Sequence, residues 1–186
     1  RVLRALFARR TNVKIIEAAV GARAGRASLS ISDRSPTMTT LATQWRDERA
    51  RDPVFARVRW NRGIDVDTMT LDTLIARFGA PAFIKIDVEG MEMQVLAGLS
   101  GVLERARPVM MAEVDNAVEA DFLAWVTAQG YALFATHQRY RLNKNHLICD
   151  AGDLDRLTEA YAASAAKAEA PAESTEVLTQ GEVGCL

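Results

Sequence analysis

The stretch AFIKIDVEGME, residues 82–92, constrains the fold more than any other part of the chain. It opens as an apolar run with β-branched residues, short enough for a buried strand, and then breaks into two acids and a glycine. After the glycine, apolar residues recur at helical spacing: Met91, Val95, Leu99 and Val102. A buried strand that turns directly into a helix is half of a βαβ unit, so we predict an α/β fold with a parallel sheet.

The acids of this stretch fall where such folds bind ligands. In open α/β sheets the ligand crevice lies beyond the carboxyl ends of the strands, which is where Asp87 and Glu89 are predicted to lie. Side chains alternate along a strand, so Lys85 and Asp87 share a face. A lysine inside an apolar run is costly unless a carboxylate meets it, and we expect Lys85 to pair with Asp87 or with an acid on the next strand. The alternative is an ordinary strand end with solvated acids.

Residues 70–114, TLDTLIARFGAPAFIKIDVEGMEMQVLAGLSGVLERARPVMMAEV, resemble the C-terminal half of the FkbM family of methyltransferases. The resemblance rests on TLD at 70–72, KIDVEG at 85–90 followed by Glu92, VLAG at 95–98, and Glu113 at the end of the next strand. Residues 12–25 also resemble the family's third strand and the turn after it. The resemblance implies a Rossmann-like class I methyltransferase sheet and S-adenosyl-L-methionine as cofactor. It also implies O-methylation of a small-molecule substrate, a hydroxyl of a sugar or small metabolite.

Two features that such enzymes use to hold the cofactor are not found in the sequence: a glycine-rich turn after the first strand and an acid after the second. In the family's strand order, 3-2-1-4-5-7-6, the first two strands lie between strands 3 and 4. We therefore expect a sheet that lacks its first two strands and a chain that is the C-terminal portion of a longer polypeptide. A decayed or repurposed relative is the alternative. As given, the chain is expected to bind S-adenosylmethionine poorly.

The rest of the chain predicts alternating helices and strands. Helices are expected at residues 2–10, 71–78, 91–105, 117–129 and 153–162. Strands are expected at residues 13–19, 27–32, 64–69, 108–114, 131–135 and 146–149, the last two as an antiparallel pair. Residues 33–61 are an irregular insertion with some helix at 40–51. Trp45, Phe55 and Trp60 in this insertion either line a substrate pocket or anchor it to the body.

Composition and charge indicate the extent of the domain, the class of partner and the cellular compartment. Residues 1–157 are predicted to be a partial methyltransferase domain. Residues 158–186 are predicted to hold the end of a helix and, from about residue 163, a disordered tail rich in Ala, Glu, Ser and Thr. A net charge of -1 gives no reason to expect nucleic acid or a membrane as partner. Cys149 and Cys185 lie far apart, which favours a reducing, cytoplasmic compartment. A homodimer is one of the oligomeric states that the sequence allows.

Transfer of a methyl group to a hydroxyl requires a group that removes the hydroxyl proton. Carboxylates and imidazoles predicted at strand ends are the candidates: Asp87, Glu89, Glu113, Asp115 and His137. Asp87 ranks first because it ends the central strand, with Glu113 and His137 next. Carried over from the family, the cofactor contacts are Glu17 and Ala18 near the adenine, together with Asp87 and Glu89.

Two alternatives are left open at the site. Glu92 is equally explained as an acid in the first turn of a helix, where the helix dipole favours a negative charge. We predict no metal site, because nothing in the spacing of the acids requires one. The alternative function is a non-catalytic α/β module, derived from a truncated methyltransferase, that binds a partner or dimerises.

Overall fold

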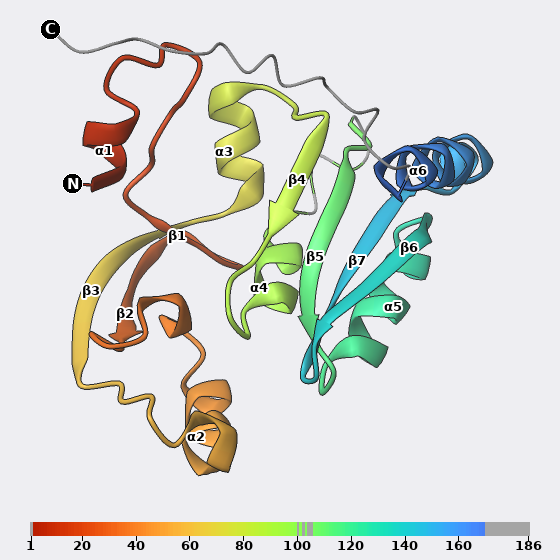
Figure 1. Cartoon of the computed structure of the whole chain (residues 1–186). Helices are drawn as coiled ribbons and strands as arrows, with labels where there is room; N and C mark the ends of the chain where they lie inside the picture. The colour runs from red at the N-terminus through yellow and green to blue at the C-terminus, as the bar shows by residue number, and fades with distance from the viewer. Residues whose placement is uncertain (1, 100, 102, 104–105, 170–186) are drawn as a thin grey trace, which may run out of the picture.

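The computed structural model describes residues 2–99, 101, 103 and 106–169, which form a mixed α/β fold with two sheets (Figure 1). The smaller sheet has the order β1-β3-β2, and the larger has the order β4-β5-β7-β6. The strands are β1 (Ala19–Val20), β2 (Gly25–Ile31), β3 (Arg62–Met69), β4 (Phe83–Ile86), β5 (Val109–Asp115), β6 (Tyr131–Tyr140) and β7 (Asn143–Asp150). The helices are α1 (Val2–Leu6), α2 (Thr43–Arg51), α3 (Leu71–Phe78), α4 (Glu92–Ala97), α5 (Glu119–Ala128) and α6 (Leu154–Glu169).

The larger sheet carries the main core. β4 and β5 run parallel, and β7 pairs antiparallel with both β5 and β6, which confirms the predicted antiparallel pair. Alternate side chains of β5 are fully buried at Met110, Ala112 and Val114. They form one core with Phe122 and Val126 of α5. Because side chains alternate along a strand, the odd-numbered residues of β5 must face the other side of the sheet.

Helix α3 forms over the residues that the sequence predicts. Thr70 is the N-cap, and its hydroxyl accepts a hydrogen bond from the Thr73 amide. Asp72 lies in the first turn, where the helix dipole favours a negative charge. Gly79, with a φ of 92°, ends the helix. Local signals specified this element completely.

The predicted buried strand at residues 13–19 is wrong. Only Ala19 and Val20 pair with β3, and residues 13–18 carry no strand. A strand needs a hydrogen-bonding neighbour along its length, and the parallel register with β3 covers only those two residues. The apolar composition of residues 13–19 was a local signal that no partner among the described residues supports.

β4 forms where the sequence predicts a buried strand, but only one of its faces is buried. Ile84 and Ile86 are buried, whereas Phe83 is 50% exposed and Lys85 lies on the same open face. Within the described residues, β4 is hydrogen-bonded to β5 alone. The Lys85 ammonium does pair with the Asp87 carboxylate, as predicted. Because both side chains are more than 40% exposed, this pair contributes little to stability.

The ends of other predicted elements shift. β6 and β7 are longer than predicted, and α1 is shorter than residues 2–10. α4 ends at Ala97, and residues 100, 102, 104 and 105 of the longer predicted helix lie outside the described residues. α6 continues to Glu169, so residues 163–169 are helical rather than disordered. The remaining tail, 170–186, lies outside the described residues.

The end of α4 joins the two sheets. Gly98 packs so closely on the chain beside β1 that a Cβ there would lie 2.4 Å from the Gly21 carbonyl oxygen. The Asp72 amide at the start of α3 donates to the Gly98 carbonyl at 3.0 Å. Glycine is required at this crossing because no side chain fits between the two backbones.

Candidate active site

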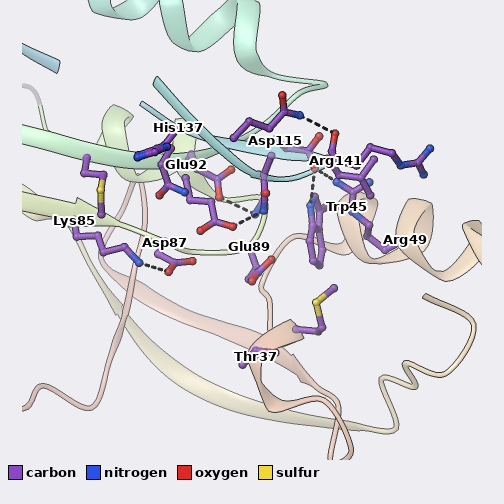
Figure 2. A pocket seen from close by; sticks show the side chains of 18 of the residues that line it. Thr37, Trp45, Arg49, Lys85, Asp87, Glu89, Glu92, Asp115, His137 and Arg141 are labelled. Atoms are coloured by element: carbon purple, nitrogen blue, oxygen red, sulfur yellow. Dashed lines mark hydrogen bonds and ion pairs between the residues drawn. The ribbon is translucent and has the colours of Figure 1, made fainter. Parts of the chain in front are cut away.

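A cavity of about 1050 Å³ lies on the open face of the larger sheet (Figure 2). Its floor consists of the side chains that alternate away from the core on three strands: Lys85 and Asp87, then Met111, Glu113 and Asp115, then Asn143, Asn145 and Leu147. Its other wall comes from the predicted insertion, through Trp45, Arg49 and Phe55. The volume is that of a site for a small molecule.

The turn after β4 projects acids into this cavity. Glu89 has a φ of 49°, and among the described residues it is the one non-glycine residue with a positive φ. This left-handed conformation costs a non-glycine residue about 1–2 kcal/mol. Gly90 follows with a φ of 92°, and a Cβ on it would lie 2.5 Å from Cγ of Trp45. The glycine of the EG pair is therefore fixed both by backbone conformation and by the indole packed on it.

Glu89 is a cavity-lining acid whose pKa is strongly raised. Burial, followed by the negative charges of Asp87 and Glu113, raises the pKa of Glu89 to about 7. The Arg49 guanidinium acts in the opposite direction, but it offsets only part of this effect. A carboxylate whose pKa lies near neutrality can take up and release a proton under ordinary conditions, as a general base must.

Glu92 is 3% exposed, although it is charged in its ionised form. Its Oε1 accepts a hydrogen bond from the Gly90 amide at 2.9 Å. Its Oε2 is buried with no hydrogen-bond partner among the described residues. Burial raises the pKa of Glu92, so the protonated form is favoured more than in an exposed glutamate.

The insertion is attached to the sheet through Asp115. This carboxylate accepts from Nε1 of Trp45 at 3.1 Å, from the Arg49 guanidinium, and from the Ala117 amide at 2.9 Å. Arg49 also lies over the Trp45 and Phe55 rings, at 5.2 and 5.5 Å from their centroids. Trp45 and Phe55 therefore line the cavity, and Trp45 anchors the insertion as well. Trp60 is not among the residues that line this cavity, and its Nε1 donates to the Met38 carbonyl within the insertion at 2.7 Å. Asp115, one of the candidate bases, is occupied by this anchor.

The structure divides the predicted site residues between two cavities. Asp87, Glu89, Glu113 and His137 all line the large cavity. Glu113 is held by the Asn143 amide, and His137 is exposed on β6. Glu17 and Ala18 instead line a second cavity of about 490 Å³, together with Val88 and Met91. The Glu17 carboxylate pairs with Arg4 at 2.9 Å.

The turn after β4 lies between these two cavities. Asp87 and Glu89 line the large one, while Val88 and Met91 line the small one. The small cavity is mainly apolar, with Glu17 as its charged residue, so it fits a flat ring system better than an ionic group. The residues present thus fit the adenine end of the implied cofactor.

Sequence reasoning missed Thr40, the residue that ties the insertion to this turn. Thr40 is 1% exposed, and its hydroxyl donates to the Glu89 carbonyl at 2.6 Å. Nothing in the local pattern of residues 33–61 marks it, because its partner lies 49 positions away. Glu92 was read only as a helix-start acid, and its bond to Gly90 shows a second role.

No group of three or more His, Cys, Asp or Glu among the described residues is arranged to hold a metal ion. No helix in the same part of the chain has the length and apolar character needed to cross a bilayer.

A mixed α/β fold with acids gathered in a cavity at a strand-to-helix turn is typical of enzymes that act on small molecules. The sequence profile of the Methyltransferase FkbM domain matches residues 4–141, and the chain belongs to the FkbM methyltransferase family. This match confirms the resemblance found at residues 70–114. Searches of curated proteins and of solved structures gave no match.

Proposed function

We propose that this chain forms the acceptor side of an S-adenosylmethionine-dependent O-methyltransferase that acts on a hydroxyl of a sugar or another small metabolite. The observation that carries the proposal is the turn after β4. It places two carboxylates in a cavity of small-molecule size and forms the wall of a second, apolar cavity. A donor and an acceptor held on two sides of one turn can be brought into contact there, which is the main requirement of methyl transfer.

Glu89 is the general base of this proposal. It lines the acceptor cavity, and its pKa of about 7 suits removal of a proton near neutral pH. Asp87 ranked first from the sequence, but its carboxylate is paired with Lys85 and is 41% exposed. In the proposal the Asp87 charge helps to raise the pKa of Glu89. Asn143 and Asn145 on the cavity floor offer hydrogen bonds to further hydroxyls of the acceptor.

The small cavity is the proposed site for the adenine of the donor, held by Glu17, Ala18 and Val88. S-adenosylmethionine, when bound, supplies an electrophilic methyl group. The chain's own residues hold the acceptor, take its proton at Glu89, and shield the oxygen with Trp45 and Phe55.

The strand order supports a class I sheet without its first two strands. The larger sheet has the order β4-β5-β7-β6, which agrees with the last four positions of the family's order. In the proposal, the family's first two strands would lie between this sheet and β1. Among the described residues β4 is the outermost strand of its sheet and Phe83 is half exposed, which supports further strands beside β4 in the proposed class I sheet.

Calorimetric titration with S-adenosylmethionine tests the proposal, on this chain and on the polypeptide encoded by its whole open reading frame. We expect weak binding to the chain and, where the open reading frame encodes further residues, tighter binding to the longer polypeptide, with methyl transfer to polyhydroxylated acceptors. The Glu89→Gln substitution should lower the transfer rate by about 100-fold or more, whereas Asp121→Asn on the exposed face of α5 should leave it unchanged. No detectable binding at millimolar cofactor in either form would favour the non-catalytic module.

A further inference from the structure

The Glu89–Gly90 peptide is held at both of its hydrogen-bonding groups by side chains from different parts of the chain. Its carbonyl oxygen accepts from the Thr40 hydroxyl at 2.6 Å. Its amide donates to Oε1 of Glu92 at 2.9 Å. Both side chains are at least 97% buried, since Thr40 is 1% and Glu92 3% exposed. Water therefore has little access to compete for either bond.

Thr40 is itself fixed in place. Its backbone amide and carbonyl exchange hydrogen bonds with Ser30 of β2, at 3.0 and 2.8 Å. Its hydroxyl also accepts from the Ala42 amide at 2.8 Å, so the hydroxyl proton is directed at the Glu89 carbonyl. The smaller sheet thus reaches the turn of the larger sheet through one oriented hydroxyl group.

A strained turn needs such support. Glu89 adopts a left-handed backbone conformation that a glutamate disfavours, and such strain persists only where the surroundings enforce it. Released, the residue would return to a common conformation, and its side chain would leave its present place in the cavity. The backbone conformation at Glu89 therefore decides where the carboxylate points.

We propose that Thr40 and Glu92 are positioning residues, which hold the Glu89–Gly90 peptide from two sides and thereby keep the Glu89 carboxylate in the acceptor cavity. The inference rests on the proposed function of Glu89 as general base. It assigns a role in positioning the proposed base to two residues, of which Glu92 lines the acceptor cavity and Thr40 lines the small cavity.

The pKa of Glu89 reports the position of its carboxylate, because charged side chains surround it. Asp87 on its own turn, Glu92 on α4 and Glu113 on β5 raise its pKa, and Arg49 on α2 lowers it. Lys85, His137 and Arg141 line the same cavity. If the turn relaxes, Glu89 loses both its burial and its acidic neighbours, and its pKa must fall towards that of an exposed glutamate.

The first experiment follows the Glu89 carboxyl by carbon NMR over a pH titration, with Glu89→Gln identifying the resonance. Thr40→Val removes the hydroxyl at nearly constant volume, and Thr40→Ser keeps it. We expect Thr40→Val to lower the titration midpoint of Glu89 by about half a unit or more, and Thr40→Ser to leave it at the wild-type value. Equal midpoints in wild type and Thr40→Val would overturn the proposal.

A second variant tests the other hydrogen bond of the peptide, from the Gly90 amide to Glu92. Glu92→Asp keeps the carboxylate but shortens it by one methylene, so that it no longer reaches the Gly90 amide. It is expected to shift Glu89 in the same direction, and it keeps the proposal testable should Thr40→Val not fold. A Glu89 midpoint that stays at the wild-type value in folded Glu92→Asp also contradicts the proposal.

Kinetics on the complete polypeptide separate this proposal from the function on which it rests. In Thr40→Val, we expect kcat to fall about tenfold or more, KM for the acceptor to change little, and the acid limb of the pH–rate profile to move to lower pH. The NMR arm does not depend on turnover. An inactive wild type would refute the proposed function, while the NMR result would still decide whether Thr40 and Glu92 position Glu89.

Discussion

Glu89 combines burial, a left-handed backbone and three acidic neighbours at one residue. Each of these raises the free energy of the folded chain with Glu89 ionised. The folded pKa is about 7, against 4.5 for the ordinary group, so between these two values the folded state binds more protons than the unfolded state. By linkage, the contribution of Glu89 to the free energy of unfolding falls as the pH rises from about 4.5 to about 7.

The Glu89→Gln variant should therefore be more stable than wild type at neutral and higher pH. The gain is expected to be largest above about pH 7 and to vanish well below pH 4.5, where wild-type Glu89 is protonated in both states. Urea denaturation of both proteins across this range measures it. A stability difference that does not depend on pH would show that Glu89 is not perturbed in the folded chain.

Gly90 is predicted to be irreplaceable for a steric reason. Gly90→Ala adds a Cβ 2.5 Å from Trp45 at a residue whose φ is 92°. Gly79 has the same φ with nothing within 4 Å of its Cβ position, so Gly79→Ala isolates the cost of the backbone. We expect about 1–3 kcal/mol of destabilisation for Gly79→Ala and about 1–3 kcal/mol more for Gly90→Ala, measured by urea denaturation. Equal losses would mean that the indole moves aside freely.

Some contacts between individual residues could be predicted from the sequence, and others could not. The pairing of Lys85 with Asp87 followed from alternation along a strand and the cost of an unpaired lysine. The hold of Thr40 on Glu89 could not be predicted, because it depends on the three-dimensional path of an irregular insertion. The raised pKa of Glu89 has the same origin, since it requires Glu113 on another strand to lie nearby.

Among the elements, α2 depends on one attachment more than on its own sequence. No residue of α2 is buried, and its side chains show no apolar face towards the body. Besides the hydrogen bond from Arg46 to the Ser30 hydroxyl of β2, α2 is linked to the larger sheet by Asp115, whose side chain is 12% exposed and which binds both Trp45 and Arg49. Short helices without a packed apolar face are marginal in water, so this attachment decides whether the wall of the cavity persists.

Asp115→Asn is expected to loosen α2 while the sheet remains intact. The amide can still accept from Ala117, but its N–H group then faces the Trp45 and Arg49 donors. Hydrogen exchange over residues 43–51 should accelerate about tenfold or more, with β5 unchanged. Glu48→Gln is the control, because Glu48 accepts from Gln44 on the exposed side of the same helix. Equal exchange in both variants would contradict the anchoring role.

The elements also show where pattern reading succeeds. α3 was predicted with its observed bounds because the signals that set them are local: Thr70, Asp72 and Gly79. Residues 13–19 were misassigned because an apolar run is ambiguous, and whether it becomes a strand depends on a neighbour elsewhere in the chain. β4 was placed correctly, yet its open face was missed, since exposure depends on what covers the sheet.

For the whole molecule, the junction between the two sheets passes through Gly98. Its carbonyl accepts from Asp72, and its Cα lies against the Gly21 carbonyl. The α/β class and the strand order of the larger sheet could be inferred from the sequence and its family resemblance. The separation into two sheets required the coordinates, because it depends on which strand edges find partners.

Gly98→Ala should weaken this junction. The added methyl group would lie 2.4 Å from a backbone oxygen, which a side-chain rotation cannot relieve. Gly21→Ala is the matched control from the other side of the contact, since its Cβ meets nothing within 4 Å. We expect Gly98→Ala to lose about 1–3 kcal/mol relative to Gly21→Ala in thermal or urea denaturation. Equal stabilities would mean that the sheets can slide apart at little cost.

The insertion contains both positions that should stay unchanged in enzyme engineering and positions that can be varied. Thr40 and Trp45 hold the proposed base and the cavity wall, whereas Val54, in a short 3-10 segment, lines the cavity and is 68% exposed. Libraries aimed at new acceptors would gain by randomising Val54 and its neighbours, because shape there can vary without disturbing the proton-accepting group. The residues that select the acceptor and the residues that position the proposed base could then be changed independently, although both belong to one insertion.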